Sequence, residues 1–417
     1  MRTVGLITEY NPFHNGHLHH LQESLRVADA DASVAVMSGH FLQRGEPALI
    51  DKWARAEMAL AAGVDLVLEL PFAFACNSAP HFARGAVQSL NGLGVVDTLC
   101  FGSEAGEVSS LQPVAQLLVE YAADIDSGTR QLLRNGVSYP VARAEVLSAM
   151  APEVSAALVS SPNNILGIEY LKALLETSSP IEAFTILRRG AGYHSTDLTS
   201  PIASATGIRK RLDEGGTVGE FVPEACRQIL SQALARGRSL DHDRLFSSLQ
   251  TFLLQEMETL SGIYQVEDGL AQRLVDAAMT ATSYADLTDA IKSRQWTLTR
   301  IQRILSYVLL QVSGVEMNSF LECGPLYLRL LGATKTGRQV LADSRKKRSL
   351  PVISDPARAQ AVLRRFYSGR KDLGCLAESM LACDLRATRL YGLLQKNPVQ
   401  GHRNQDFFRE CLGLGKD

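Results

Sequence analysis

Short apolar runs alternate with helical segments over the first 110 residues, and this alternation restricts the fold more than any other feature. The runs at Val4–Ile7, Ser33–Ser38, Val64–Leu70 and Val95–Phe101 predict strands. Apolar residues at helical spacing occupy the intervals, as in Lys52–Ala62. Strands joined by helices pair in parallel through right-handed crossovers. The sequence therefore predicts an α/β fold built around a parallel sheet.

The alternation then gives way to helices. Residues from about 107 to 177 show a mainly helical pattern, which predicts an insertion before a fifth strand at Ala183–Leu187. Beyond Gly215 we find no strand signal. A boundary there divides the chain into an α/β domain, 1–215, and a mostly α-helical domain, 216–417. Helical periodicity in the second domain covers 222–236, 242–259, 267–280, 284–293, 298–312 and 357–389.

The first predicted strand leads directly into a turn that contains two histidines, His14-x-Gly16-His17. A helix is expected to begin near His17, because leucines from Leu18 onward recur at helical spacing. A helix N-terminus offers N–H groups and a positive dipole end to an anion, and Gly16 permits close approach. The two imidazoles can donate hydrogen bonds to phosphate oxygens. A four-residue pattern also arises by chance, but its place after the first strand favours ATP-dependent nucleotidyl transfer.

Further positions are expected at the same edge of the sheet. Gly102 follows the fourth strand and would leave room for an adenine or ribose. A guanidinium after the fifth strand would bind phosphates in a fork geometry that lysine lacks. Each position singly is more typical of a cap or a solvated edge, but jointly they favour a nucleoside triphosphate. The others are Asn163-Asn164, Arg188-Arg189 and the helix start Ser204-x-Thr206-x-x-Arg209, where Ser204 or Thr206 would be the N-cap.

Other kinds of site are disfavoured. The histidines at 14, 17, 19 and 20 cluster, but apart from Glu9 the turn lacks a carboxylate or thiol to complete a zinc set, so we expect no metal site. No P-loop pattern occurs. Cys76 and Cys100 lie in or beside apolar runs and are expected to be core residues.

Composition restricts the compartment. The seven cysteines form no CxxC pair and are odd in number, which is typical of reduced thiols in a cytoplasmic protein. Val4–Ile7 is too short for the apolar part of a signal peptide. No apolar run approaches the roughly 18–20 residues of a membrane span. We therefore expect a cytoplasmic protein with no membrane partner.

The net charge of −2 is unevenly distributed. Residues 1–215 hold 15 Lys and Arg against 23 Asp and Glu, which leaves 27 against 21 in the remainder. A basic second half suggests a polyanionic partner, although any one of its clusters is more typical of a solvated helix face. Possible stacking rings lie among the clusters, at Trp296, Tyr307, Phe366 and Tyr367. The basic stretches are Lys292–Arg303, Lys335–Arg338, Arg345–Arg348, Arg364-Arg365 and Arg370-Lys371.

Long motifs in both halves resemble the bacterial tRNA(Met) cytidine acetate ligase family. The likeness covers nearly the whole chain, and its motifs in the first half are longer and more specific than HxGH. Those motifs are Gly5–His17, Met37–Pro47, Asp51–Trp53 with Arg55–Met58, Gly63–Pro71, Ser161–Gly167 through Glu169-Tyr170, and Arg188–Gly190; Leu331–Gly337 and Leu350–Ser354 follow in the second half. His40 stands where the family leads us to expect Asn, which leaves the role of that side chain open.

The resemblance implies a Rossmann-like nucleotidyltransferase domain followed by a basic helical domain that binds tRNA. The implied reaction activates acetate with ATP, with Mg²⁺ as the expected companion ion. The acetyl group then passes to N4 of the wobble cytidine in elongator tRNA(Met). His14 and His17 would be the catalytic residues. The implied ATP site consists of Ile7, Thr8, Glu9, Tyr10, Asn11, Pro12, Phe13, His14, Asn15, Gly16, His17, Leu18, His19, His20, Gly102, Asn164, Arg188 and Arg189.

Two alternatives remain at this point. An adenylyltransferase for a small phosphorylated cofactor precursor would share the HxGH turn, but it would not need a basic helical half. A non-catalytic protein that binds ATP and RNA would also carry both features. The sequence assigns no base for the acetyl transfer, and it does not define the pocket wall that would select acetate.

Overall fold

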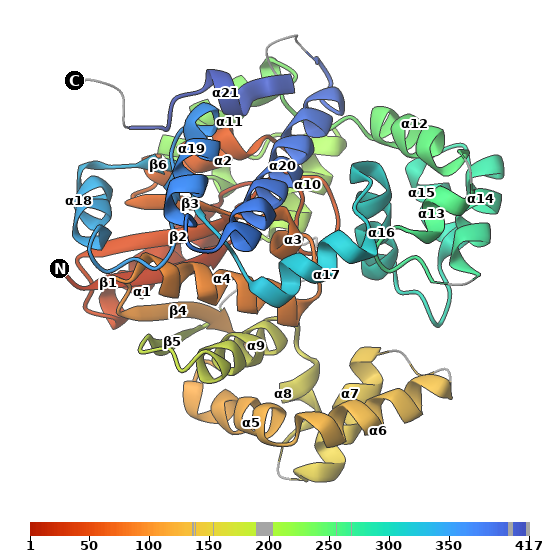
Figure 1. The fold of residues 1–417 in the computed structure, drawn as a ribbon, viewed down its shortest axis with the longest axis horizontal. Helices are drawn as coiled ribbons and strands as arrows, with labels where there is room; N and C mark the ends of the chain where they lie inside the picture. The colour runs from red at the N-terminus through yellow and green to blue at the C-terminus, as the bar shows by residue number, and fades with distance from the viewer. Residues whose placement is uncertain are drawn as a thin grey trace.

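The computed structural model describes residues 1–135, 137, 139–152, 154–188, 203–255, 257–267, 269–398 and 403–413. A seven-stranded sheet lies at its centre, with strand order β5-β4-β1-β2-β3-β6-β7 (Figure 1). The first five strands are parallel, and the Rossmann-like α/β fold is confirmed. The strands are β1 Thr3–Thr8, β2 Ala32–Ser38, β3 Leu66–Leu70, β4 Thr98–Ser103, β5 Glu182–Leu187, β6 Leu328–Ala333 and β7 Val352–Ile353.

Helices cover both faces of the sheet, so that every residue of the central strand β2 is buried. One face packs against α1 and α2 together with later helices, and the other packs against α4 and α9. The helices of the first half outside the insertion are α1 Asn15–Val27, α2 Lys52–Ala61, α3 Phe72–Ala75, α4 Ala79–Leu93, α9 Pro162–Glu176 and α10 Ala205–Asp213.

The predicted helical insertion is present between β4 and α9. Its helices project from the β5 side of the sheet, and they are drawn in yellow at the bottom of Figure 1. They are α5 Val108–Glu120, α6 Ala122–Arg134, α7 Tyr139–Met150 and α8 Ala156–Ser160.

The second half is mostly helical, as predicted, and its helices pack around the sheet and at one side of it (Figure 1). The helical periodicity did not predict α17, α18 or α21. The elements are η1 Gly219–Phe221, α11 Glu224–Ala235, α12 His242–Leu253, α13 Met257–Ser261, α14 Leu270–Thr280, α15 Tyr284–Ile291, α16 Leu298–Leu310, α17 Gly314–Cys323, α18 Lys335–Ser344, α19 Pro356–Phe366, α20 Lys371–Leu393 and α21 Gln405–Phe408.

The prediction that strands end before Gly215 is wrong, because β6 and β7 complete the sheet. β6 pairs antiparallel with β3, and β7 pairs parallel with β6. The apolar run of β6 is interrupted by Arg329, a buried cation that Asp406 neutralises at 3.3 Å. Because this ion pair forms only in the folded protein, the sequence showed a charged residue within the run and did not predict a buried strand. No helix among the described residues is long and apolar enough to cross a membrane.

Candidate active site

The HxGH turn connects β1 to α1, and its histidines form the cap of the helix. The backbone N–H of Gly16 donates to His14 Nδ1 at 3.0 Å, and the N–H of His14 donates to His17 Nδ1 at 3.3 Å. The helix therefore begins at Asn15 rather than near His17, because His14 takes the place of the Ser or Asp that usually caps a helix.

This capping arrangement fixes where the imidazole protons are. Both Nδ1 atoms accept hydrogen bonds, so the proton of each neutral ring lies on Nε2. Burial, with the charges of Arg188 and Arg209, lowers the pKa of His14 to about 3. Burial and the neighbouring His14 hold the pKa of His17 well below its usual range. Two neutral rings with centroids 3.8 Å apart thus carry Nε2–H donors, whose remaining partners must come from outside the cap.

Strands β4 and β5 bring Gly102 and Arg188 to the same edge of the sheet as the turn. β4 is the neighbour of β1, and the N–H of Arg188 donates to the Ser103 carbonyl at 2.9 Å. A Cβ atom on Gly102 would lie 3.1 Å from Arg188 Cγ, so glycine leaves this close approach open. The charge of Arg188 lowers the pKa values of His14, His17 and His20, which places its guanidinium beside the turn. Arg189 lies outside the described residues.

The Asn163-Asn164 pair holds the loop that follows β4. Asn164 Oδ1 accepts from the N–H groups of Glu104 and Ala105 at 2.9 and 3.0 Å. The Glu104 carboxylate accepts in turn from Asn163 Nδ2 at 2.6 Å and from the Asn164 N–H at 2.8 Å. The pair lies in the first turn of α9. In this structure Asn164 positions the loop beside Gly102.

Arg209 also contacts the turn. It lies on α10, whose N-cap is Ser204, one of the two predicted candidates, and the Gly207 N–H donates to the Ser204 hydroxyl at 3.0 Å. Arg209 Nη1 donates to the Asn11 carbonyl at 2.9 Å, and its charge contributes to the low pKa of His14. Two arginines, one after β5 and one on α10, therefore lie close to His14.

Arg55 is a residue whose role the sequence analysis missed. Its buried guanidinium joins the carboxyl ends of two strands by donating to the Glu9 and Ser38 carbonyls at 2.6 and 3.0 Å and to the Gly39 carbonyl. The sequence indicated the importance of Arg55 only through its position in one of the long family motifs. Because its partners are backbone carbonyls distant in sequence, no spacing rule pointed to them.

His40 belongs to the interior and not to the HxGH turn. Its ring stacks on Tyr391 with centroids 4.4 Å apart, and burial holds its pKa well below the usual range. It packs beside a buried ion-pair cluster in which Lys52 binds Glu69 and Asp406 at 2.8 and 2.9 Å. These contacts indicate a packing role.

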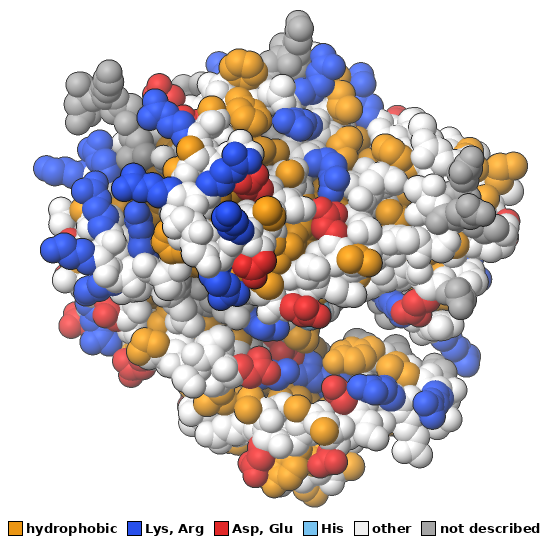
Figure 2. All heavy atoms as spheres, in the orientation of Figure 1, with side chains coloured by type: hydrophobic (Ala, Val, Ile, Leu, Met, Phe, Trp, Pro, Cys, Tyr) orange, Lys and Arg blue, Asp and Glu red, His pale blue; other side chains and the backbone are white. Residues whose placement is uncertain are grey.

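The basic stretches of the second half fall in several places. The stretch Arg345–Arg348 follows α18, whose N-cap Thr334 donates its hydroxyl to Asp65 at 2.9 Å. Asp65 directly precedes β3, so α18 lies at the amino edge of the parallel strands, opposite the HxGH turn. In the view of Figure 2, Lys and Arg side chains gather on the side of the molecule where α18 lies.

Two of the rings proposed for stacking are core residues, so that prediction is wrong for them. Tyr307 is fully buried and donates its hydroxyl to the Cys76 carbonyl at 2.7 Å. Tyr367 donates to the Leu326 carbonyl at 2.7 Å and is 8% exposed. Cys76 and Cys100 are buried, as predicted. No three His, Cys, Asp or Glu side chains of the described residues come together as metal ligands.

Comparison with known proteins identifies relatives over the whole chain. The model of the HIGH Nucleotidyl Transferase family matches residues 1–406. A tRNA(Met) cytidine acetate ligase of Syntrophotalea carbinolica is 52% identical over 417 residues, 99% of each chain. The Bacillus subtilis protein of the same name is 37% identical and covers 96% of this chain and 94% of its own.

A solved structure has the same fold. The crystal structure of Thermotoga maritima TmcAL bound with alpha-thio ATP is 34% identical, covers 99% of both chains and superposes with a TM-score of 0.88. The apo form of the same protein superposes with a TM-score of 0.90 at 35% identity.

Proposed function

The chain belongs to the tRNA(Met) cytidine acetate ligase family, and we propose that it activates acetate with ATP and acetylates N4 of the wobble cytidine in elongator tRNA(Met). The observation that carries the proposal is the pair of neutral imidazoles in the cap of α1. They present two N–H donors at the end of β1, where charge would develop on the phosphates. A tRNA substrate also implies a cytoplasmic enzyme.

The proposed ATP site follows the family resemblance and the geometry of the carboxyl edge. It comprises the stretch Ile7–His20, Gly102, Asn164, Arg188 and Arg189. The charges of Arg188 and Arg209, which both lower the pKa of His14, support this site, because both cations lie close to the histidines. Such cations favour the negative charge of a triphosphate.

Two displacements make up the reaction. In the first, an acetate oxygen attacks the α-phosphorus, and the bond to the oxygen that bridges to the β-phosphate breaks, so that pyrophosphate leaves with the electron pair. In the second, N4 of cytidine attacks the acetyl carbon, and the bond from that carbon to the adenylate oxygen breaks. AMP leaves, and the amine releases one proton to solvent. His14 and His17 donate to the phosphate oxygens in the first step and lower its barrier.

The proposal also assigns a different substrate to each half of the chain. Residues 1–215 would hold ATP and acetate, and the helices of 216–417 would hold tRNA. Mg²⁺ supplies charge neutralisation when it is bound to a triphosphate, mainly through phosphate oxygens and water. The described residues form no three-ligand cage, so we expect the ion to arrive with ATP and derive no step from it.

Acetate-dependent exchange of pyrophosphate into ATP tests the proposal. Wild-type protein should catalyse exchange with acetate and not without it, and labelled acetate should enter tRNA(Met). Exchange that is indifferent to acetate would support an adenylyltransferase instead. If neither exchange nor incorporation is measurable in wild type and His14→Ala alike, the protein is not a catalyst of this reaction.

A further inference from the structure

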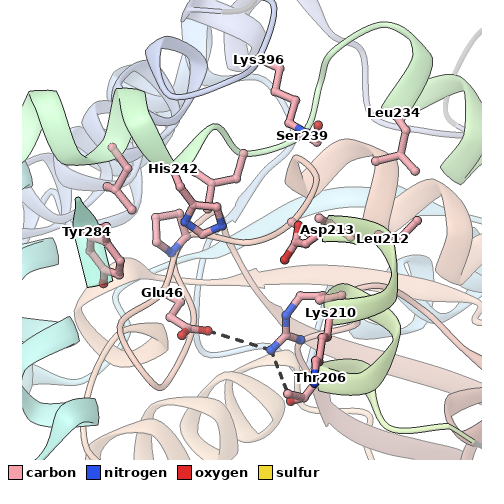
Figure 3. A pocket seen from close by; sticks show the side chains of 15 residues that line it. Glu46, Thr206, Lys210, Leu212, Asp213, Leu234, Ser239, His242, Tyr284 and Lys396 are labelled. Atoms are coloured by element: carbon pink, nitrogen blue, oxygen red, sulfur yellow. Dashed lines mark hydrogen bonds and ion pairs between the residues drawn. The ribbon is translucent and has the colours of Figure 1, made fainter. Parts of the chain in front are cut away.

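A cavity of about 440 Å³ lies beside the HxGH turn, at the same edge of the sheet. The histidines of the turn do not line it. Its walls come from the loop between β2 and α2, from α10, from the starts of α12 and α15, and from the segment after α20. Figure 3 shows Glu46 and Tyr284 on one side of the cavity, with Thr206, Lys210 and Asp213 on the other. This volume is within the range of about 300–1,000 Å³ that is typical of small-molecule sites.

One side chain connects the cavity to the turn. Arg209 lines the cavity and donates to the Asn11 carbonyl of the turn at 2.9 Å. Its other nitrogen, Nη2, lies 3.4 Å from the Thr206 hydroxyl and 4.0 Å from the Glu46 carboxylate (Figure 3). Arg209 therefore contacts the turn and also forms part of the cavity wall.

The lining combines three kinds of group that a nucleotide needs. Tyr284 and His242 offer ring faces for stacking, with centroids 6.3 Å apart. Lys210 and Lys396 are exposed cations that suit a phosphate backbone. The carboxylates of Glu46 and Asp213 suit an exocyclic amine, as in the contacts of Glu and Asp with cytosine N4. A site for a free anion would not need the carboxylates, and a site for an apolar ligand would not need the lysines.

We propose that this cavity receives the unstacked acceptor nucleotide of the RNA, with its amine held near Glu46 or Asp213 until it meets the acetyl-adenylate. The inference rests on the proposed function and adds the place where its second substrate binds. The bond that forms joins the amine nitrogen to the acetyl carbon, and the acyl–phosphate oxygen bond breaks with loss of AMP and a proton. The base must leave its stack to enter such a cavity.

Kinetics with a tRNA(Met) transcript and exchange without tRNA together test the inference. Tyr284→Leu, His242→Ala and Lys396→Ala should each lower kcat/KM for tRNA acetylation by about tenfold or more, because each removes a stacking or phosphate contact. Acetate-dependent exchange should stay at the wild-type rate. Tyr284→Phe keeps the ring and should retain most of the transfer. Arg244→Ala, on α12 but outside the cavity, is the matched control and should behave as wild type.

The outcomes separate the inference from the function on which it rests. Unchanged transfer in all three cavity variants would overturn the acceptor site while leaving the ligase assignment intact. Loss of exchange together with transfer would also overturn it, since the cavity would then serve activation. Absence of acetate-dependent exchange in wild type would instead remove the proposed function itself.

Discussion

The two edges of the central sheet carry positive charge in different ways. At the carboxyl edge, Arg188 and Arg209 lie near the histidine turn, and Arg209 donates to its backbone. At the amino edge, the stretch Arg345–Arg348 lies beside α18, and its first three side chains are exposed to solvent. The first edge is preorganised around a point where charge can develop, while the second is a solvated basic surface.

This difference shows that charge density and chemical competence are separate properties. A count of basic residues along the sequence would point to the amino edge as the functional site, because most of the cations there are consecutive in sequence. The six residues of β1 span about 20 Å, so that edge lies roughly this far from the histidines. We therefore expect the amino edge to affect only tRNA affinity and the carboxyl edge to affect the reaction. The predictions below test this separation, from the largest expected effect to the smallest.

Apart from replacement of His14 itself, Arg209→Ala should have the largest effect. It removes a charged hydrogen bond to Asn11, a cation beside His14 and the link to the cavity. Charged hydrogen bonds contribute about 1.5–3 kcal/mol, so kcat/KM for exchange should fall about 10- to 100-fold. Arg209→Lys keeps the charge without the fork and should recover only part of the rate. An exchange rate equal to that of wild type in Arg209→Ala would show that this arginine is dispensable for activation.

Asn164→Ala should weaken ATP binding and the fold together. It leaves the N–H groups of Glu104 and Ala105 without their acceptor, which costs about 1–3 kcal/mol for buried groups. We expect a lower Tm and a KM for ATP about five- to tenfold higher. Asn135→Ala, on the exposed end of α6, is the control. A lower Tm with an unchanged KM would restrict Asn164 to stability.

The charge state of His14 and His17 can be measured directly by imidazole nitrogen NMR of the free protein. Both rings should remain neutral Nε2–H tautomers from pH 8 down to about 5, since burial lowers their pKa values, that of His14 to about 3. In the unfolded chain these groups titrate near 6.5. Their contribution to stability is therefore complete above about pH 6.5 and is lost as the pH falls toward 3. Protonation of either ring near pH 6.5 would contradict the neutral cap.

Replacing Arg345, Lys346, Lys347 and Arg348 by Ala should have the smallest effect. We expect tRNA affinity to fall a few-fold at moderate salt, with a shallower salt dependence and unchanged ATP binding. Unchanged tRNA affinity would remove the amino edge from the RNA surface.

The sequence predicted the parts of the fold that depend on local pattern. The five parallel strands and the helical insertion lie where apolar spacing predicted them, and Ser204, one of the two predicted candidates, caps α10. The misses depend on tertiary contacts. β6 was hidden by Arg329, whose charge is neutralised by Asp406 at the far end of the chain. The rings of Tyr307 and Tyr367 occur near basic stretches, but their hydroxyl groups bind buried carbonyls.

The candidate site was predicted in composition more than in geometry. HxGH marked the turn, but no pattern showed that the histidines cap their own helix and are thereby fixed as Nε2–H donors. Asn164 was named as an ATP-binding residue, and no pattern showed that its side chain also holds the loop after β4. The role of Arg55 depends on where three strand-end carbonyls meet, which only the folded chain defines.

Acetate-dependent exchange in the absence of tRNA tests the separation of the two edges most directly. His14→Asn should be compared with the fourfold Arg345–Arg348 variant, because Asn preserves a capping oxygen while it removes the imidazole donor. We predict that exchange falls about 10²- to 10³-fold in His14→Asn, as for loss of a preorganised donor, and stays at the wild-type rate in the fourfold variant. Equal rates in both variants, whether both high or both low, would contradict the account.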